Sequence, residues 1–221
     1  MGNVVSWIIS KVLANRLKPI LPNVISNLQC AFVPGRIIIE NTTVAFEMLY
    51  RMRNRAKGKK GHMAVKLDIS KAYDRVEWEF LQRMMKKIGL PDQWVNLVME
   101  SVRTASYSTF INGEPRSLIT PTCGIKQGDP LSPYLFLICT EGLYSLICRA
   151  VDRSLLKGVM SCHGGVRVSH LLFADDSLLF CEATIEECQN LMHILAMYER
   201  ALGQAINRQK TTLFSAQTQS N

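Results

Sequence analysis

Two adjacent aspartates, Asp175 and Asp176, stand in the otherwise apolar stretch LLFADDSLLF at residues 171–180. A pair of carboxylates is costly in apolar surroundings unless a positive charge compensates it. The central residues Ala-Asp-Asp-Ser also suit a tight turn between two strands. The pattern therefore indicates either an exposed acidic turn or a binding site for cations.

A third carboxylate favours the cation site. Asp68 stands at the end of the strand VKLD, which is part of the strand-like stretch MAVKLDIS at residues 63–70, and Val65 and Leu67 would share one face of it. If this strand lies beside the hairpin at 171–180, three carboxylates meet at one end of a sheet. Such a cluster needs cations, and hard oxygen ligands favour Mg²⁺ or Mn²⁺. Two such ions are typical of in-line phosphoryl transfer.

Other chemistries find little support in the sequence. The four histidines form no evident triad, and neither a phosphate-binding GxxxxGK[ST] loop nor a serine elbow is present. Seven cysteines without a CxxC pair indicate reduced thiols rather than a zinc site or a disulfide framework, which weakly favours an intracellular protein. The net charge of +8 favours a polyanionic partner such as nucleic acid without establishing one.

Hydrophobic periodicity predicts interleaved helices and strands in a single chain. Helices are expected at residues 7–18, 42–55, 71–90, 92–105, 134–151 and 183–203. Hairpins are expected at 106–120, where Asn112-Gly113 is a strong turn signal, and at 166–180. This order predicts an α+β protein in which an antiparallel sheet packs against helices. The N-terminal apolar segment is too interrupted to cross a membrane, and we expect no membrane partner.

Three local details complete the expected organisation. Asn41 is expected to cap the helix at 42–55, and Pro130 to occupy the first turn of the helix that follows it. The basic stretch at 51–62 is either a solvated loop or a contact to a phosphate backbone. We favour the loop, because no aromatic residue is interleaved for stacking on bases.

Five ordered blocks of the sequence resemble a known family. KLDISKAYD, QGDPLSPYLF and FADD look like the palm of a reverse transcriptase, and are most similar to those of LINE-type (non-LTR) retrotransposons. The upstream block SKVLANRLKPILPNVISNLQCAFVPGRIIIEN resembles the fingers, and ALGQAINRQKT resembles the block after the catalytic hairpin. The resemblance implies a palm-and-fingers fold, with a partial fingers region at 1–62 and a palm region at 63–221.

The resemblance also implies an activity. The chain would be an RNA-directed DNA polymerase that adds dNTPs to a primer 3′-hydroxyl on an RNA template, with two Mg²⁺ (or Mn²⁺) ions. Asp68 and Asp175 would hold both ions, Asp176 would be a more peripheral third carboxylate, and the carbonyl of Ile69 would complete one coordination shell. Such an enzyme would act in the nucleus or the cytoplasm, and its oligomeric state stays open.

The remaining roles that the resemblance implies concern the nucleotide. Tyr73 would lie under the sugar and leave no room for a 2′-hydroxyl, which disfavours the alternative of an RNA-dependent RNA polymerase. Gln127 and Gly128 would line the site of the incoming nucleotide and template. Arg36 would lie near the triphosphate, and Lys210 is a possible general acid for the departing pyrophosphate.

Compared with the family, the expected fingers block begins further upstream and further segments follow the position of Lys210. We therefore expect a reverse transcriptase domain that is incomplete at both ends, with the thumb absent. An alternative is a non-catalytic retroelement remnant that binds RNA or a protein partner, or that has no activity.

Overall fold

The computed structural model describes residues 4–54, 61–161, 165–203 and 205–216. The helices are α1 (Val4–Leu17), α2 (Leu21–Val24), α3 (Ile38–Asn54), α4 (Trp78–Lys87), α5 (Asp92–Arg103), α6 (Ser132–Asp152) and α7 (Ile185–Leu202). The strands are β1 (His62–Leu67), β2 (Ile69–Ser70), β3 (Tyr107–Ile111), β4 (Glu114–Ile119), β5 (Val159–Met160), β6 (Arg167–Val168), β7 (His170–Phe173), β8 (Asp176–Glu182), β9 (Ala205–Ile206) and β10 (Thr212–Ala216).

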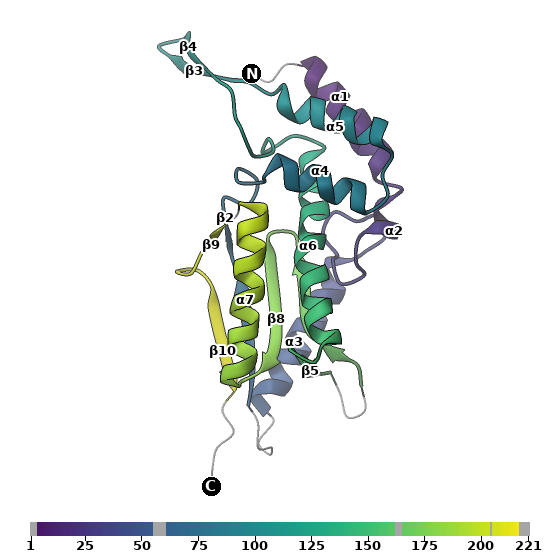
Figure 1. The fold of residues 1–221 in the computed structure, drawn as a ribbon, viewed down its shortest axis with the longest axis vertical. Helices are drawn as coiled ribbons and strands as arrows, with labels where there is room; N and C mark the ends of the chain where they lie inside the picture. The colour runs from purple at the N-terminus through teal and green to yellow at the C-terminus, as the bar shows by residue number, and fades with distance from the viewer. Residues whose placement is uncertain (1–3, 55–60, 162–164, 204, 217–221) are drawn as a thin grey trace.

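The main sheet has four antiparallel strands in the order β10-β1-β8-β7. Of these strands, β10 and β8 are labelled in Figure 1. In this sheet β1 lies between β8 and β10, and its last residue, Leu67, pairs with Ser177 near the start of β8. The residue after β1, Asp68, therefore lies at the end of the sheet where β7 turns into β8. The predicted proximity of the 63–70 strand and the 171–180 hairpin is confirmed.

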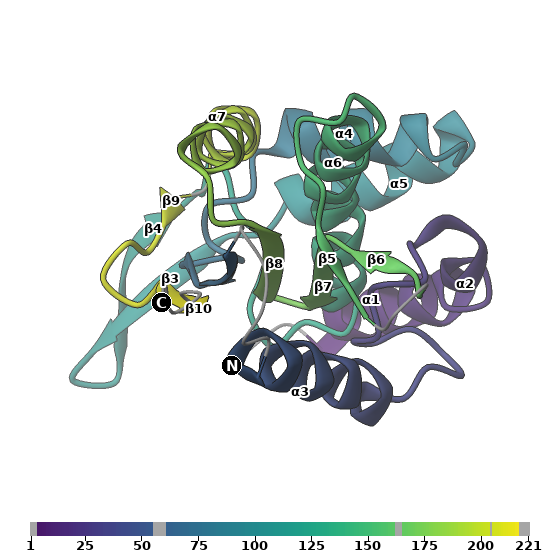
Figure 2. The ribbon, with the colours of Figure 1, turned by 90° about the horizontal axis from the view of Figure 1, so that it is seen from below.

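Helices cover both faces of this sheet (Figure 2). Because side chains alternate along a strand, Met63, Val65 and Leu67 of β1 point into the larger core, which includes α6 and α7. The intervening Ala64 points the other way, into a smaller core that includes Met48 and Met52 of α3. The predicted antiparallel sheet packed against helices is therefore present.

The larger core continues into the N-terminal helices. Leu13, Leu17 and Leu21, from α1 and α2, belong to the same buried cluster as Leu67 of the sheet. In Figure 1, α1, α4 and α5 form a layer above the sheet, and α4 packs on α6 below it. The division into regions 1–62 and 63–221 stays a prediction, and these regions share one hydrophobic core.

The long helix α6 is the central support of the fold. Among the described residues it is the helix whose length and composition would allow a membrane span, yet 61% of its apolar window is buried against the rest of the protein. Leu135, Phe136 and Leu137 are almost completely inaccessible to solvent. A helix that is apolar on most of its circumference is expected at such a position within a core.

The predicted helices are present, but three expected termini are wrong. Helix α3 begins at Ile38, so Asn41 lies inside it and its side chain donates to the carbonyl of Leu28 (2.8 Å) instead of capping. Helix α4 begins at Trp78, because residues 71–75 form a turn at the cavity described below. Helix α6 begins at Ser132, and the proline in its first turn is Pro133 rather than Pro130.

Both predicted hairpins are confirmed. β3 and β4 are joined at Asn112 and Gly113, whose φ values of 53° and 83° fit the turn that the sequence favours. β7 and β8 are joined at Ala174 and Asp175. Of the basic stretch at 51–62, residues 51–54 complete α3, and 55–60 lie outside the described residues.

Candidate active site

Six of the predicted site residues line one cavity of about 550 Å³. They come from the turn after β1, the loop before α6, the β7–β8 turn and the segment after β9. The lining residues are Asp68, Ile69, Ser70, Lys71, Ala72, Tyr73, Asp74, Arg75, Gln127, Asp175, Asn207 and Lys210. Residues separated by more than a hundred positions in the sequence therefore meet at one end of the main sheet.

Asp68 owes its position to a break between two strands. β1 ends at Leu67, and β2 leaves the main sheet to pair with β9, where Ile69 faces Ile206. At the break, the carbonyl of Asp68 accepts from the backbone N–H of Asn207 (2.8 Å). This contact fixes the direction of the chain at Asp68 and brings the segment at 207–210 to the cavity.

Asp175 is placed by the turn between β7 and β8. Phe173 pairs with Asp176, so Ala174 and Asp175 form the two-residue connection. Ala174 has a φ of 52°, a left-handed conformation that is unfavourable for a residue with a Cβ atom. The hairpin thus presents Asp175 in an exposed position, clear of the leucine-rich core beneath it. The sequence left open an exposed acidic turn or a binding site for cations, and both interpretations apply to Asp175, because the turn is exposed and also borders a cavity.

Tyr73 forms part of the cavity wall. Its ring stacks on Phe136 of α6, with ring centroids 5.0 Å apart and planes inclined by 19°. Burial raises the pKa of Tyr73, and the negative charge of Asp175 adds to this effect. The ring is therefore packed against the core, and it shares the cavity wall with Asp175.

The loop before α6 is anchored to the turn after β2 at Gly124. The backbone N–H of Gly124 donates to the carbonyl of Val76 (2.8 Å), and the carbonyl of Gly124 accepts from Trp78 Nε1 (2.7 Å). A Cβ atom at Gly124 would lie 2.6 Å from the carbonyl oxygen of Asp74, so glycine is required sterically as well as by its φ of +89°. This anchoring carries Gln127 to the cavity.

Basic side chains balance the carboxylates of the cavity. Lys71, Arg75 and Lys210 line it together with Asp68 and Asp175. Such a mixture of both signs suits an anionic ligand that arrives together with cations.

Lys210 is held in place by a compact turn. Its backbone N–H donates to the carbonyl of Asn207 (3.1 Å) and to Asn207 Oδ1 (3.3 Å). Asn207 thus connects two sides of the cavity, since its own N–H also donates to Asp68.

Three predicted site residues do not line this cavity. The Asp176 carboxylate points to the neighbouring strand and pairs with Lys66 (3.4 Å), with both side chains about half exposed. Gly128 has a φ of +81° and nothing within 4 Å of its would-be Cβ. Of these two loop glycines, Gly124 and not Gly128 has a close backbone neighbour.

Arg36 is the third such residue, and its guanidinium is engaged by the fold. Nη1 donates to the carbonyls of Ser26 and Gln29 (2.6 Å to the latter), and Nη2 to those of Ile25 (2.9 Å) and Pro22 (3.3 Å). This arginine thus holds the backbone of the N-terminal segment together, and it does not line the cavity predicted to hold the triphosphate.

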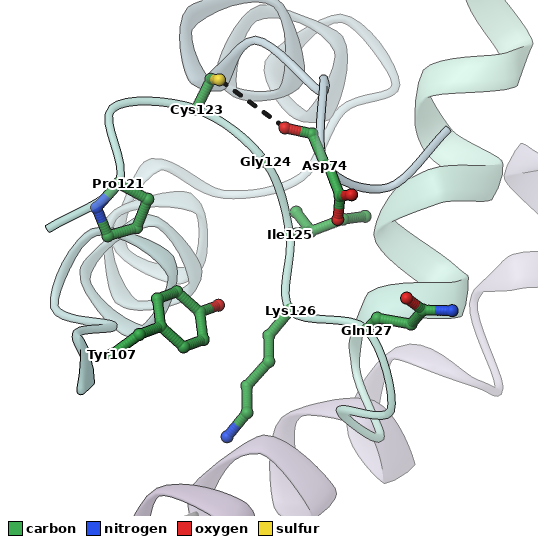
Figure 3. A pocket seen from close by; sticks show the side chains of 8 residues that line it. All are labelled: Asp74, Tyr107, Pro121, Cys123, Gly124, Ile125, Lys126 and Gln127. Atoms are coloured by element: carbon green, nitrogen blue, oxygen red, sulfur yellow. Dashed lines mark hydrogen bonds between the residues drawn. The ribbon is translucent and has the colours of Figure 1, made fainter. Parts of the chain in front are cut away.

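A second cavity of about 360 Å³ adjoins the first and shares Asp74 and Gln127 with it (Figure 3). Its lining residues are Asp74, Tyr107, Pro121, Cys123, Gly124, Ile125, Lys126 and Gln127. The Cys123 thiol contacts the carbonyl of Asp74 (3.6 Å) at its upper edge. Burial raises the pKa of Tyr107, and the charges of Asp74 and Asp129 contribute further.

The donor set of the larger cavity fits a hard divalent cation in part. Within the described part of the chain, no three His, Cys, Asp or Glu side chains are arranged to hold a metal ion. Asp68, Asp175 and Ile69 nevertheless border the same space. Mg²⁺ is usually bound by only one or two carboxylates together with water and substrate phosphates, so this set suits Mg²⁺ better than a metal that needs a complete protein cage.

Sequence reasoning missed five cavity residues, Ser70, Ala72, Asp74, Arg75 and Asn207. Asp74 follows Tyr73 directly in the KAYD segment, which offered a signal. Asn207 lies three residues before Lys210, and only the pairing of β2 with β9 reveals its contact with Asp68.

Comparison with known proteins identifies the family. Residues 3–221 match the family described as reverse transcriptase (RNA-dependent DNA polymerase), and the chain belongs to it. Among curated proteins, it is 33% identical over 169 residues to the Pol polyprotein of the type-1 retrotransposable element R2 of Popillia japonica, covering 76% of this chain and 27% of that protein. It is 27% identical over 189 residues to a 149 kDa protein of the transposon TX1 of Xenopus laevis, covering 83% of this chain and 14% of the relative. These relatives define it as a reverse transcriptase domain of the LINE type.

A further match is shorter. The chain is 52% identical over 68 residues to an uncharacterized mitochondrial protein of Arabidopsis thaliana, covering 31% of this chain and 56% of the relative. The chain thus spans between about a seventh and just over half of these relatives' lengths.

Solved structures confirm the predicted polymerase fold. The telomerase of Candida tropicalis, solved in complex with a fragment of telomeric RNA, superposes with a TM-score of 0.62 at 13% identity and covers 96% of this chain and 34% of the telomerase chain. The telomerase of Candida albicans gives a TM-score of 0.59 at 14% identity, covering 97% of this chain and 35% of that chain. At these identities the likeness concerns the fold alone.

Proposed function

We propose that this chain catalyses RNA-directed DNA synthesis by two-metal nucleotidyl transfer, extending a DNA primer on an RNA template with dNTPs. The observation that carries the proposal is the single cavity in which Asp68, Ile69 and Asp175 meet Tyr73, Gln127 and Lys210. Membership of the reverse transcriptase family supports the same reaction.

Each residue of the cavity has a role in this proposal. Asp68, Asp175 and the carbonyl of Ile69 would hold Mg²⁺ or Mn²⁺. Such ions neutralise charge on the phosphates and activate the primer hydroxyl for in-line attack. Asp176, paired with Lys66, lies at the edge of this set and would be an outer carboxylate.

The nucleotide would be bound by other residues of the same cavity. The rigid ring of Tyr73, stacked on Phe136, would lie under the sugar and exclude a 2′-hydroxyl. Gln127 would contact the nucleotide or the template base. Lys71, Arg75 and Lys210 would face the phosphates, and Lys210 would be the possible general acid. Arg36 has no part in this proposal, because its donors are engaged by backbone carbonyls.

The test is primer extension on an RNA template with dNTPs and Mg²⁺, comparing the parent chain with Asp175→Asn. We expect incorporation to fall by more than about 100-fold, since loss of a direct ligand should exceed the ~10–100-fold typical of losing an outer partner. Asp92→Asn is the matched control, because this exposed carboxylate pairs with Lys86 on a surface away from the cavity.

Equal extension by the parent and Asp175→Asn would refute the metal assignment. A folded parent that binds primer–template but incorporates nothing would instead favour the alternative of a remnant that binds nucleic acid without catalysis.

A further inference from the structure

The turn that carries Asp175 is held in place by a residue far away in the sequence. The side chain of Gln29 is completely buried, and its Oε1 accepts from the backbone N–H of Ala174 (3.2 Å). The same oxygen accepts from the N–H of Ala31 (3.1 Å). Because both partners are N–H donors, the atom facing them must be the amide oxygen, which fixes the orientation of the Gln29 amide.

The contact acts on the strained residue of the turn. Ala174 has a left-handed backbone, with a φ of 52°, although it carries a side chain. Such a conformation persists only where the surroundings enforce it. The hydrogen bond from Ala174 to Gln29 is the side-chain contact among the described residues that restrains this backbone directly, one residue before Asp175.

The segment around Gln29 is docked along the edge of β7. Gln29 forms an isolated parallel bridge with Leu172, and the N–H of Leu172 donates to the carbonyl of Leu28 (3.1 Å). The Cys30 thiol lies 3.9 Å from the carbonyl of Leu172. The outer edge of the hairpin that presents Asp175 is therefore covered by residues 28–30.

This segment is itself rigidly tied to the fold. The carbonyl of Gln29 accepts from Arg36 Nη1 (2.6 Å), and the carbonyl of Leu28 accepts from Asn41 Nδ2 (2.8 Å) on α3. At its other end, the N–H of Ser26 donates to Glu141 of α6 (2.9 Å). Gln29 therefore reaches the turn from an anchored support.

One feature of Gln29 argues against a role in stability alone. Within the described residues, its buried Nε2 has no hydrogen-bond partner. Such an unpaired donor lowers stability, and groups of this kind in native proteins are concentrated at functional positions. An apolar residue of similar shape would avoid this cost but could not accept from Ala174.

We propose that Gln29 is a positioning residue that holds the β7–β8 turn so that Asp175 can bind a divalent cation. The inference rests on the proposed function, in which Asp175 is a metal ligand, and adds a residue outside the cavity that fixes the position of this ligand. The hydrogen bond between Gln29 and Ala174 acts on the residue next to Asp175 and not on the metal ligand itself, as outer-sphere hydrogen bonds do in metalloenzymes.

The test is Gln29→Met, which keeps the length of the side chain and removes the acceptor. Amide hydrogen exchange is measured at Ala174, and Mn²⁺ affinity is measured by electron paramagnetic resonance in the presence of dTTP. We expect exchange at Ala174 to be about tenfold faster or more, and the Mn²⁺ dissociation constant to rise about tenfold. Thermal unfolding checks that the variant is folded.

Thr140→Val is the control. It also replaces a buried polar side chain by an apolar one of similar size, but the Thr140 hydroxyl donates to the carbonyl of Leu137 within α6 and not to the turn or to the segment at 28–30. It should leave exchange at Ala174 and Mn²⁺ affinity within about twofold of the parent, whatever its effect on unfolding.

Gln29→Glu is a second variant that retains an oxygen acceptor at the same reach. It should keep the slow exchange of Ala174, and it serves as the comparison if Gln29→Met does not fold. Parent-like exchange and Mn²⁺ affinity in folded Gln29→Met would overturn the proposal. If the parent itself binds no Mn²⁺, the proposed function is wrong, and exchange at Ala174 still decides whether Gln29 holds the turn.

Discussion

Arg36 and Lys210 are both basic residues that the sequence assigns to the nucleotide, and the fold places them in opposite settings. The guanidinium of Arg36 donates to four backbone carbonyls in the segment at 20–36, including those of Ile25 and Gln29. Lys210 lies at the cavity with Asp68 and Asp175, on a turn held by its backbone rather than by its side chain.

The difference extends to the two regions as wholes. In the segment at 20–36, and on the elements that contact it, polar side chains such as Arg36 and Glu141 hold the backbone in place. At the cavity, backbone contacts hold the polar side chains, as the Asp68–Asn207 contact does. A polar residue is available for chemistry where the fold can position it without using its side chain.

The largest effect on stability is expected for Arg36→Met. Loss of the guanidinium would leave several carbonyls without a donor, at about 1–3 kcal/mol each before water replaces part of the loss. We expect the free energy of unfolding to fall by about 4 kcal/mol, measured by urea denaturation. Arg103→Met is the control, because that exposed side chain donates to Gln82 at the surface and should change stability by less than about 0.5 kcal/mol. An equally small effect of Arg36→Met would mean that the Arg36 side chain does not stabilise the fold, and Arg36 and Lys210 would then not differ in this respect.

The next largest effect, on how the free energy of unfolding depends on pH, is expected for Glu141. Burial in α6 raises its pKa from 4.5 to about 7, against the opposing effects of the hydrogen bond from Ser26 and the charge of Arg36. The folded state therefore binds a proton that the unfolded state has lost between pH 4.5 and 7, so this group lowers stability as the pH rises through that window.

His170 acts with the opposite sign. Burial lowers its pKa to about 4, so the unfolded state binds the extra proton between pH 4 and 6.5, and stability rises with pH there. The two contributions oppose each other in the parent. In Glu141→Gln only the contribution of His170 remains, and stability should rise between pH 4.5 and 6.5.

The measurement is urea denaturation of both proteins from pH 4.5 to 7.5. Relative to the parent, Glu141→Gln should gain about 3 kcal/mol over this range. Glu79→Gln, at an exposed i,i+4 pair with Arg83, is the control and should show a constant difference. A constant difference for Glu141→Gln as well would mean that Glu141 ionises normally in the folded state.

The smallest effect is expected at the cavity, for Tyr73→Val. Removing the ring would open space beside the nucleotide sugar, and the preference for dNTPs over rNTPs should fall about tenfold, an amount typical of a purely steric contact. Tyr73→Phe keeps the ring on Phe136 and should retain the preference. Single-nucleotide incorporation with each substrate provides the ratio, and an unchanged ratio in Tyr73→Val would remove the sugar contact from the proposal.

Much of the fold follows from local patterns in the sequence. Alternation in residues 63–67, the Asn112-Gly113 turn and the apolar run of α6 each specify a local structure that the tertiary fold retains, whereas the strand predicted at 63–70 is interrupted at Asp68. Two of the termini that were wrong involve distant partners. Asn41, inside α3, donates to Leu28, and in the turn at 71–75 Tyr73 and Asp74 contact the loop at 123–125.

Local patterns in the sequence place Asp68 after a strand and Asp175 in a hairpin turn, because strand alternation and turn chemistry are local properties of the chain. That the strand and the hairpin are neighbours is a result of their pairing in the sheet. Which charged groups remain available likewise depends on tertiary contacts, because their partners lie far away in the sequence. Carbonyls between Pro22 and Gln29 engage Arg36, Lys66 on the adjacent strand engages Asp176, and Gln29 reaches across to hold the turn before Asp175.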